Sequence, residues 1–195
     1  MPISQDAAFA HLEQHLDRTW NAITRAGVRC SRQSELPVFV PRTAANTLND
    51  LAFDEMVAAF DEIAGAQPRE DRMNNMRFIS IDDVILLWLK KVDSQRVKSN
   101  LMLTDHAVDL LDEQAAFEFM PHASLIVVGY WFDMETWRLR RVSFSPPSRS
   151  RPAWYFDIEP GDAGVIEMRP AGGEVPPTQT ASGLRITRGP VQRQL

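Results

Sequence analysis

A run of like charge lies between Trp137 and Arg151, where the sequence has five arginines and no acidic residue. Guanidinium groups bind phosphate oxygens through forked pairs of donors, and the serines of the same stretch can add hydroxyl donors. The whole chain carries a formal net charge of -5. The run therefore predicts a local anion-binding surface and argues against a protein that coats polyanions through bulk charge.

A second basic segment follows the apolar stretch ILLWLKK, residues 85–91. If that stretch is a strand of the same sheet as the arginine-rich run, the two segments can converge at one end of the sheet. The competing interpretation is that these cations are solvated, protect strand edges or pair with acidic helices. The predicted anion-binding or nucleic-acid-binding residues are Lys90, Lys91, Arg96, Lys98, Arg138, Arg140, Arg141, Arg149 and Arg151.

The histidines give a weaker pattern. His11 and His15 are one helical turn apart and could share a metal ion. In the zinc-protease pattern a glutamate follows the first histidine directly, and here that position holds Leu12. We therefore expect both histidines to point toward water.

Other groups that could do chemistry lack partners. Asp82, Asp83 and Asp93 could gather around a divalent cation, but no acid precedes any lysine of the basic segment by two residues, as nucleases usually require. Cys30 has basic neighbours and no histidine partner. Motifs of the GxSxG, GxxxxGK and GxGxxG types are absent. A metal-dependent enzyme is the least favoured hypothesis, and no catalytic residue, metal ligand or cofactor is predicted.

Apolar spacing predicts three helices. The first covers Asp6 to Arg25, with Ser4 as its cap and Gly27 at its end. The second lies between Thr43 and Ala64, with its aspartates in solvent, and the third opens at Thr104.

The remaining segments predict strands. Residues 65–75 are typical of a surface loop, and residues 84–92 favour strand over helix, although Ser80 and Asp83 could equally form a helix capping box. Two strand-like segments flank DMET, which predicts a hairpin. A change of phase in the second of them predicts a bulge at Arg140 and Arg141. AWYFDI, residues 153–158, predicts a further strand.

These elements predict an α+β fold, with an antiparallel sheet of about four to five strands, three helices and an extended C-terminal arm. Residues 1–160 would form a single globular domain. Residues 161–195 contain six glycines and four prolines and predict a flexible arm. Within it, GVIEM and GLRIT could add as strands to the sheet of another chain.

The leading functional hypothesis is a non-enzymatic accessory or regulatory protein that binds nucleic acid or another polyanion through a local basic patch. The alternative is an assembly or adaptor protein whose residues 161–195 order on a partner protein or on a copy of this chain. The longest apolar run has six residues, against about 20 for a spanning helix, so no membrane partner is expected. A single cysteine and the absence of a signal-like N-terminus predict a cytoplasmic location.

Overall fold

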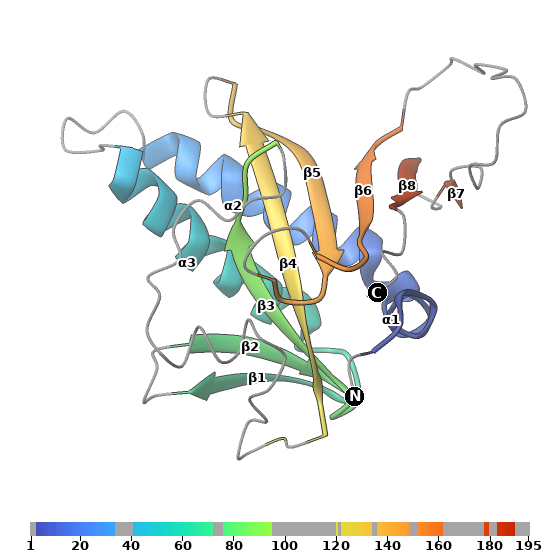
Figure 1. Cartoon of the computed structure of the whole chain (residues 1–195). Helices are drawn as coiled ribbons and strands as arrows, with labels where there is room; N and C mark the ends of the chain where they lie inside the picture. The colour runs from blue at the N-terminus through green and yellow to red at the C-terminus, as the bar shows by residue number, and fades with distance from the viewer. Residues whose placement is uncertain are drawn as a thin grey trace, which may run out of the picture.

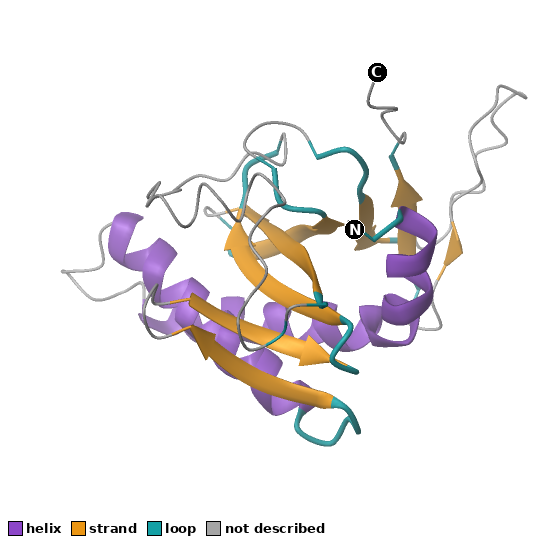
Figure 2. Ribbon diagram, turned by 60° about the horizontal axis from the view of Figure 1, so that its bottom comes forward, coloured by secondary structure: helices purple, strands orange, loops and turns teal. Residues whose placement is uncertain are grey.

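The computed structural model describes residues 3–33, 41–71, 76–94, 120, 122–133, 136–148, 152–161, 178–179 and 183–189. Within them, helices cover one face of a twisted sheet (Figures 1 and 2). The helical elements are α1 (Gln5–Leu12), a 3-10 turn η1 (Glu13–His15), α2 (Leu16–Gln33) and α3 (Pro41–Phe60). They fall in two segments, 5–33 and 41–60, and the third helix expected from Thr104 lies outside the described residues.

The described part of the chain forms an eight-stranded sheet in the order β1-β2-β3-β4-β5-β6-β8-β7. The β3–β4 pair is parallel and the other pairs are antiparallel. The strands are β1 (Ala66–Asp71), β2 (Met76–Ile81), β3 (Ile85–Lys91), β4 (Ser124–Asp133), β5 (Arg138–Ser145), β6 (Phe156–Pro160), β7 (Thr178–Gln179) and β8 (Leu184–Arg188).

The predicted antiparallel sheet of four to five strands with three helices is therefore wrong, although the fold is α+β. Parallel pairing needs a long crossover, and the chain between Lys91 and Ser124 has the length for one. Composition alone could not show how that length is used. Residues 66–71, predicted as loop, form β1 at the edge of the sheet, where Pro68 is tolerated.

The strand prediction for residues 85–91 is confirmed by β3. Its apolar run is continuous because both faces are buried: Leu87 and Leu89 join the core under the helices, while Leu86 and Trp88 join a second cluster on the opposite face. The capping-box alternative is excluded because Asp82 and Asp83 adopt φ values of 52° and 53° in the turn that links β2 to β3.

The hairpin of β4 and β5 contains the predicted bulge. Trp131 lies opposite Arg141 and Phe132 lies opposite Leu139, so Arg140 is the extra residue. The bulge shifts the phase of β5, which explains why its apolar residues change from odd to even positions.

Gly27 lies inside α2 and does not end the helix as predicted. A Cβ at this position would lie 2.3 Å from Cε1 of Phe132, so glycine allows the close packing of α2 on β4. The cap at the other end is as expected: the Ser4 hydroxyl accepts a hydrogen bond from the backbone N–H of Ala7 at 3.2 Å.

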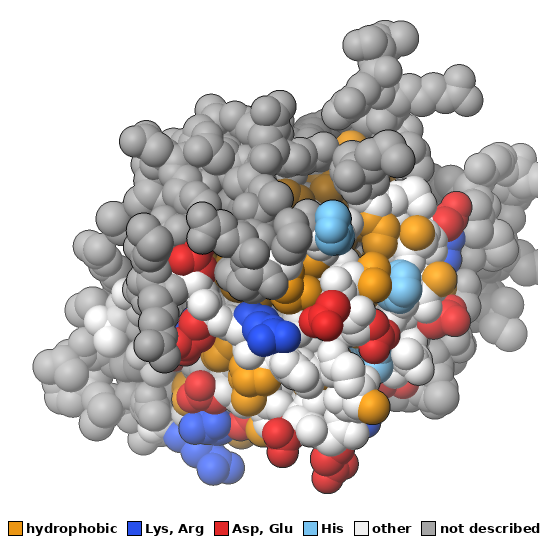
Figure 3. Space-filling model, turned by 90° about the horizontal axis from the view of Figure 1, so that it is seen from below, with side chains coloured by type: hydrophobic (Ala, Val, Ile, Leu, Met, Phe, Trp, Pro, Cys, Tyr) orange, Lys and Arg blue, Asp and Glu red, His pale blue; other side chains and the backbone are white. Residues whose placement is uncertain are grey.

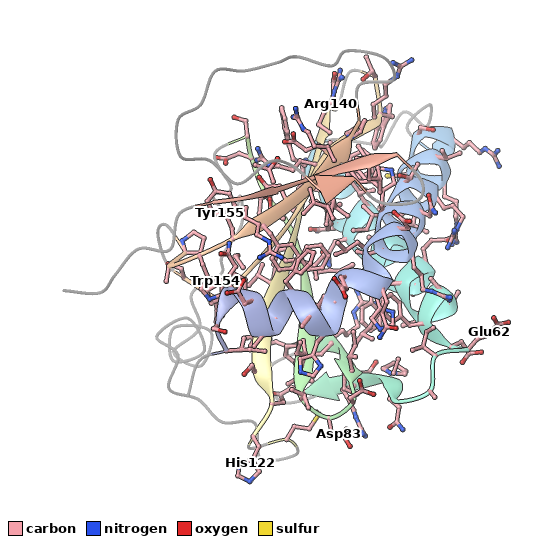
Figure 4. All side chains as sticks on the ribbon, turned by 90° about the vertical axis from the view of Figure 1, so that its right-hand side faces the viewer. Glu62, Asp83, His122, Arg140, Trp154 and Tyr155 are labelled. Carbon is pink, nitrogen blue, oxygen red and sulfur yellow. The ribbon has the colours of Figure 1, made fainter. Side chains whose placement is uncertain are left out.

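The last strand returns to the sheet of its own chain. β8 (Leu184–Arg188), which contains the last four residues of GLRIT, pairs antiparallel with β6. The Gln5 side chain donates from α1 to the carbonyls of Tyr155 at 2.7 Å and Gly189 at 3.3 Å, which holds the N-terminal helix against this end of the sheet (Figure 4). GVIEM lies outside the described residues.

Candidate functional site

Strand register brings the two basic segments to the same end of the sheet. Lys91 of β3 lies opposite Tyr130 of β4, and Trp131 lies opposite Arg141 of β5. The end of β3 and the start of β5 therefore flank β4 at one end, although about fifty positions separate them in sequence.

Arg141 connects the segments directly. Its Nη2 donates to the backbone carbonyls of Asp93 at 3.2 Å and Ser94 at 2.8 Å, just after β3. Its guanidinium lies 5.4 Å from the ring centroid of Trp131, and its Nε lies 4.0 Å from Oδ2 of Asp157. The side chain is only 8% exposed. Arg141 therefore fastens the chain after β3 to β5 and is not itself a surface cation.

The neighbouring arginines face solvent. Arg138 is exposed and makes no ion pair with any residue that the structure describes. Arg140, also exposed, pairs with Asp133 of β4 at 2.5 Å. Of the predicted cations on β5, Arg138 is thus the one whose charge is not offset by a described carboxylate.

Lys90 and Lys91 point to opposite faces of β3. The Nζ of Lys90 lies 4.1 Å from the ring centroid of Trp88, on the face away from the helices. Burial lowers the pKa of Lys90 to about 8. Lys91 is half-buried on the helix-covered face near Cys30, where burial also lowers its pKa. Neither lysine is a freely solvated cation.

The other four predicted cations, Arg96, Lys98, Arg149 and Arg151, lie outside the described residues. Figure 4 shows Arg140 at one end of the molecule and Asp83 and His122 at the other. Figure 3, which views the molecule from that second end, shows acidic and basic side chains interspersed. The described cations of the predicted surface are thus confined to the end that carries Arg140.

The histidine prediction is wrong for His15. This side chain is 5% exposed and its ring centroid lies 5.3 Å from that of Phe60. Burial, followed by the nearby Arg18, lowers its pKa. The 3-10 turn at residues 13–15 changes the helical phase, which a uniform spacing of 3.6 residues could not anticipate.

In the described ranges, no three His, Cys, Asp or Glu side chains are grouped so that they could hold a metal ion. Asp82 and Asp83 precede β3, whereas Lys90 lies near its other end, so strand length separates these carboxylates from the lysines. None of the described helices is long and apolar enough to cross a bilayer.

Sequence analysis missed a second group of polar residues. Asp50 of α3, expected in solvent, forms an ion pair with Arg77 of β2, and the Oδ1 of Asn49 accepts from the Tyr130 hydroxyl at 3.1 Å. Asn49, Asp50 and Arg77 line a cleft between β2 and β3 together with Lys90. No local pattern links these positions, because their contact depends on how α3 crosses the sheet.

Comparisons with known proteins give one partial similarity. The chain is 28% identical over 110 residues to the tRNA U34 carboxymethyltransferase of Shewanella pealeana (strain ATCC 700345 / ANG-SQ1). The matched region covers 55% of this chain and 32% of that enzyme, so the chain spans about a third of the length of its curated relative. No protein-family model and no solved structure matches the chain.

Proposed function

We propose that this protein is a non-enzymatic accessory or regulatory protein that binds nucleic acid or another polyanion at the end of the sheet where β5 begins. The proposed surface comprises the exposed Arg138 and Arg140. It also includes the four predicted cations outside the described residues, Arg96, Lys98, Arg149 and Arg151.

The contact of Arg141 with the chain after β3 is the observation that carries this proposal. Its Nη2 donates to the carbonyls of Asp93 and Ser94, and Ser94 precedes Arg96 by two positions and Lys98 by four. The same strand, β5, begins at Arg138. The chain just after β3, at Ser94, and the start of β5, at Arg138, therefore lie at the same end of the sheet.

Electrostatics sets what such a surface can do. Six cations that each contact one phosphate would give a log-log salt dependence of affinity of about -5 on duplex DNA and about -4 on a single strand. This attraction has no sequence readout, because phosphate contacts position a protein without reading bases. The acidic remainder of the chain limits binding to this one end.

The partial similarity to a tRNA-modifying enzyme suggests which nucleic acid to test first. A tRNA U34 carboxymethyltransferase acts on tRNA by its name, and this chain resembles part of it. Transfer RNA is therefore the first polyanion to test, with single-stranded RNA and duplex DNA beside it.

The test is fluorescence anisotropy of the three labelled nucleic acids at 50 and 200 mM salt. We expect affinity for tRNA to fall about 10³-fold between these salt concentrations. Arg138→Gln should lower the magnitude of the salt slope by about 1, since it removes one phosphate contact. Absent binding, or binding that salt does not weaken, would contradict the proposal.

Arg69→Gln is the matched control. Arg69 is likewise partly exposed, and its Nη2 lies 3.6 Å from Oδ1 of Asp83. Asp83 lies at the end of the molecule remote from Arg140 (Figure 4). This substitution removes one positive charge, as Arg138→Gln does. It should leave the affinity for tRNA at low salt and the salt slope unchanged, because the lost charge is remote from the proposed surface.

A further inference from the structure

The sheet opens into a fork between β2 and β3. These strands pair only where Ile79–Ile81 meets Ile85–Leu87, whereas β3 stays paired with β4 along its whole length to Lys91. Beyond the paired positions β2 diverges from β3 (Figure 1). A cleft of about 370 Å³ lies in the fork, within the size range of small-molecule sites, and α3 contributes one of its walls.

The charges of this fork cleft do not balance. Arg77 pairs with Asp50, and its guanidinium lies 4.6 Å from the ring centroid of Phe53, so these two charges offset each other. The Lys90 ammonium lies over Trp88, and no described carboxylate is within ion-pair distance of it. Among the described residues the cleft therefore holds one positive charge without a counter-ion, which is costly in a largely buried position.

A neutral donor lies in the same cleft. The Oδ1 of Asn49 accepts the hydrogen bond from the buried Tyr130 hydroxyl at 3.1 Å. Because Oδ1 accepts this bond, Nδ2 is the end of the amide that can donate to a ligand. An ammonium and an amide N–H₂ in one cleft are suited to the two oxygens of an anionic group.

We propose that the fork cleft binds a small organic carboxylate, whose carboxylate group is the counter-ion of Lys90 and accepts from the amide of Asn49. A single negative charge matches the single uncompensated cation, whereas a phosphate monoester would bring nearly two. This site goes beyond the proposed polyanion surface and does not depend on it, because Lys90 is not among the exposed cations at the start of β5.

Isothermal titration of the full chain with benzoate tests the inference, with the neutral benzamide as a matched ligand and inorganic phosphate as a third. We expect saturable binding of benzoate and at least about tenfold weaker binding of benzamide, which lacks the charge that Lys90 would pair with. Equal affinity for benzoate and benzamide, or no saturable benzoate binding, would overturn the proposal. Binding of phosphate without benzoate would overturn the ligand class.

Adjacent lysines supply matched variants. Lys90→Gln should weaken benzoate binding about tenfold or more. Lys91→Gln makes the same change one residue further along β3, on the opposite face, and should leave the affinity unchanged. If both variants bind benzoate like the unmodified chain, or both lose it equally, Lys90 is not the counter-ion.

Asp50→Asn separates a binding role from a structural one. Its side chain is 64% exposed, so the substitution should not prevent folding. It frees the charge of Arg77 and raises the net charge of the cleft, so benzoate should bind several-fold more tightly. Unchanged or weaker binding would contradict the charge argument. Failure of benzoate to bind leaves the salt-dependent tRNA measurement untouched, so the two proposals can fail separately.

Discussion

The two sides of β3 differ in how far pairing continues. On the β4 side the strand is paired to its last residue, and beyond β4 two of the three β5 arginines have described partners: Arg141 donates to backbone carbonyls and Arg140 pairs with Asp133. On the β2 side pairing stops after three residues, and Lys90 is left in a cleft without a described carboxylate partner. On the continuously paired side the buried cation, Arg141, is used to hold the chain together, whereas the break in pairing leaves the largely buried Lys90 facing a cleft.

The largest effect should come from breaking the paired side. Arg141→Leu removes two hydrogen bonds to carbonyls and leaves Asp157, which is 1% exposed, without its nearby guanidinium. Loss of one partner of a buried ion pair costs about 3–5 kcal/mol, so the free energy of unfolding in urea should fall by that amount. The exposed Arg138→Leu should change it by less than about 0.5 kcal/mol. Equal losses for the two variants would show that Arg141 has no special role.

On the β2 side of β3, the burial of Lys90 should make the free energy of unfolding depend on pH. A fall in the pKa of Lys90 from 10.5 to about 8 corresponds to roughly 3 kcal/mol. Below pH 8 Lys90 is protonated in both folded and unfolded states, and the fold bears the full cost of burying the charge. Between pH 8 and 10.5 only the unfolded state stays protonated, so the contribution of Lys90 makes stability rise with pH.

This pH dependence is measured as the difference between two proteins that share every other ionisable group, so that only the contribution of Lys90 remains. The free energy of unfolding is followed from pH 7.5 to 10.5 for the unmodified chain and for Lys90→Met. The difference in free energy of unfolding between the two proteins should decrease as the pH rises. A difference that does not change with pH would mean that Lys90 is not desolvated in the fork cleft.

At neutral pH, Lys90→Met should stabilise the fold by about 1–2 kcal/mol. The gain from removing a buried charge is reduced by the loss of the contact between the ammonium and the Trp88 ring. Lys91→Met is the comparison on the opposite face of β3. Destabilisation by Lys90→Met in thermal or urea unfolding would show that the lysine contributes more to the fold than its burial costs.

The smallest expected effect is at the surface ion pair. Arg140→Gln breaks the contact with Asp133, but 44% of the arginine side chain is exposed. Exposed pairs contribute about 0–1 kcal/mol, and salt screens them. The loss in unfolding free energy should therefore be small and disappear at high salt. If Arg140→Gln lowered the free energy of unfolding as much as Arg141→Leu, the exposed and the buried arginine of β5 would contribute equally to stability, which would contradict this expectation.

Local patterns predicted the elements better than their arrangement. The Ser4 cap, the strand at residues 85–91 and the bulge near Arg140 follow from neighbouring residues alone. The parallel pairing of β3 with β4 and the strand at residues 66–71 depend on segments distant in sequence, and both were missed. Gly27 was misjudged for the same reason, since its role is set by Phe132 on β4.

The candidate site divides in the same way. Charge clustering indicated the residues of β3 and β5, because an excess of arginine and lysine is visible in one dimension. It could not show that Arg141 is buried or that Lys90 and Lys91 face opposite sides, because burial depends on packing. The ion pair of Asp50 with Arg77 required the crossing of α3 over β2.

The pKa values of individual lysines test the central claim most directly. The chain has only three lysines, so the side-chain signals of ¹³C-labelled lysine can be assigned with Lys91→Gln and Lys98→Gln and followed by NMR from pH 6 to 12. We expect Lys90 to titrate near pH 8, well below an ordinary lysine. Titration of Lys90 near 10.5 would contradict the central claim, because a fully solvated or neutralised lysine would leave the fork without an uncompensated charge.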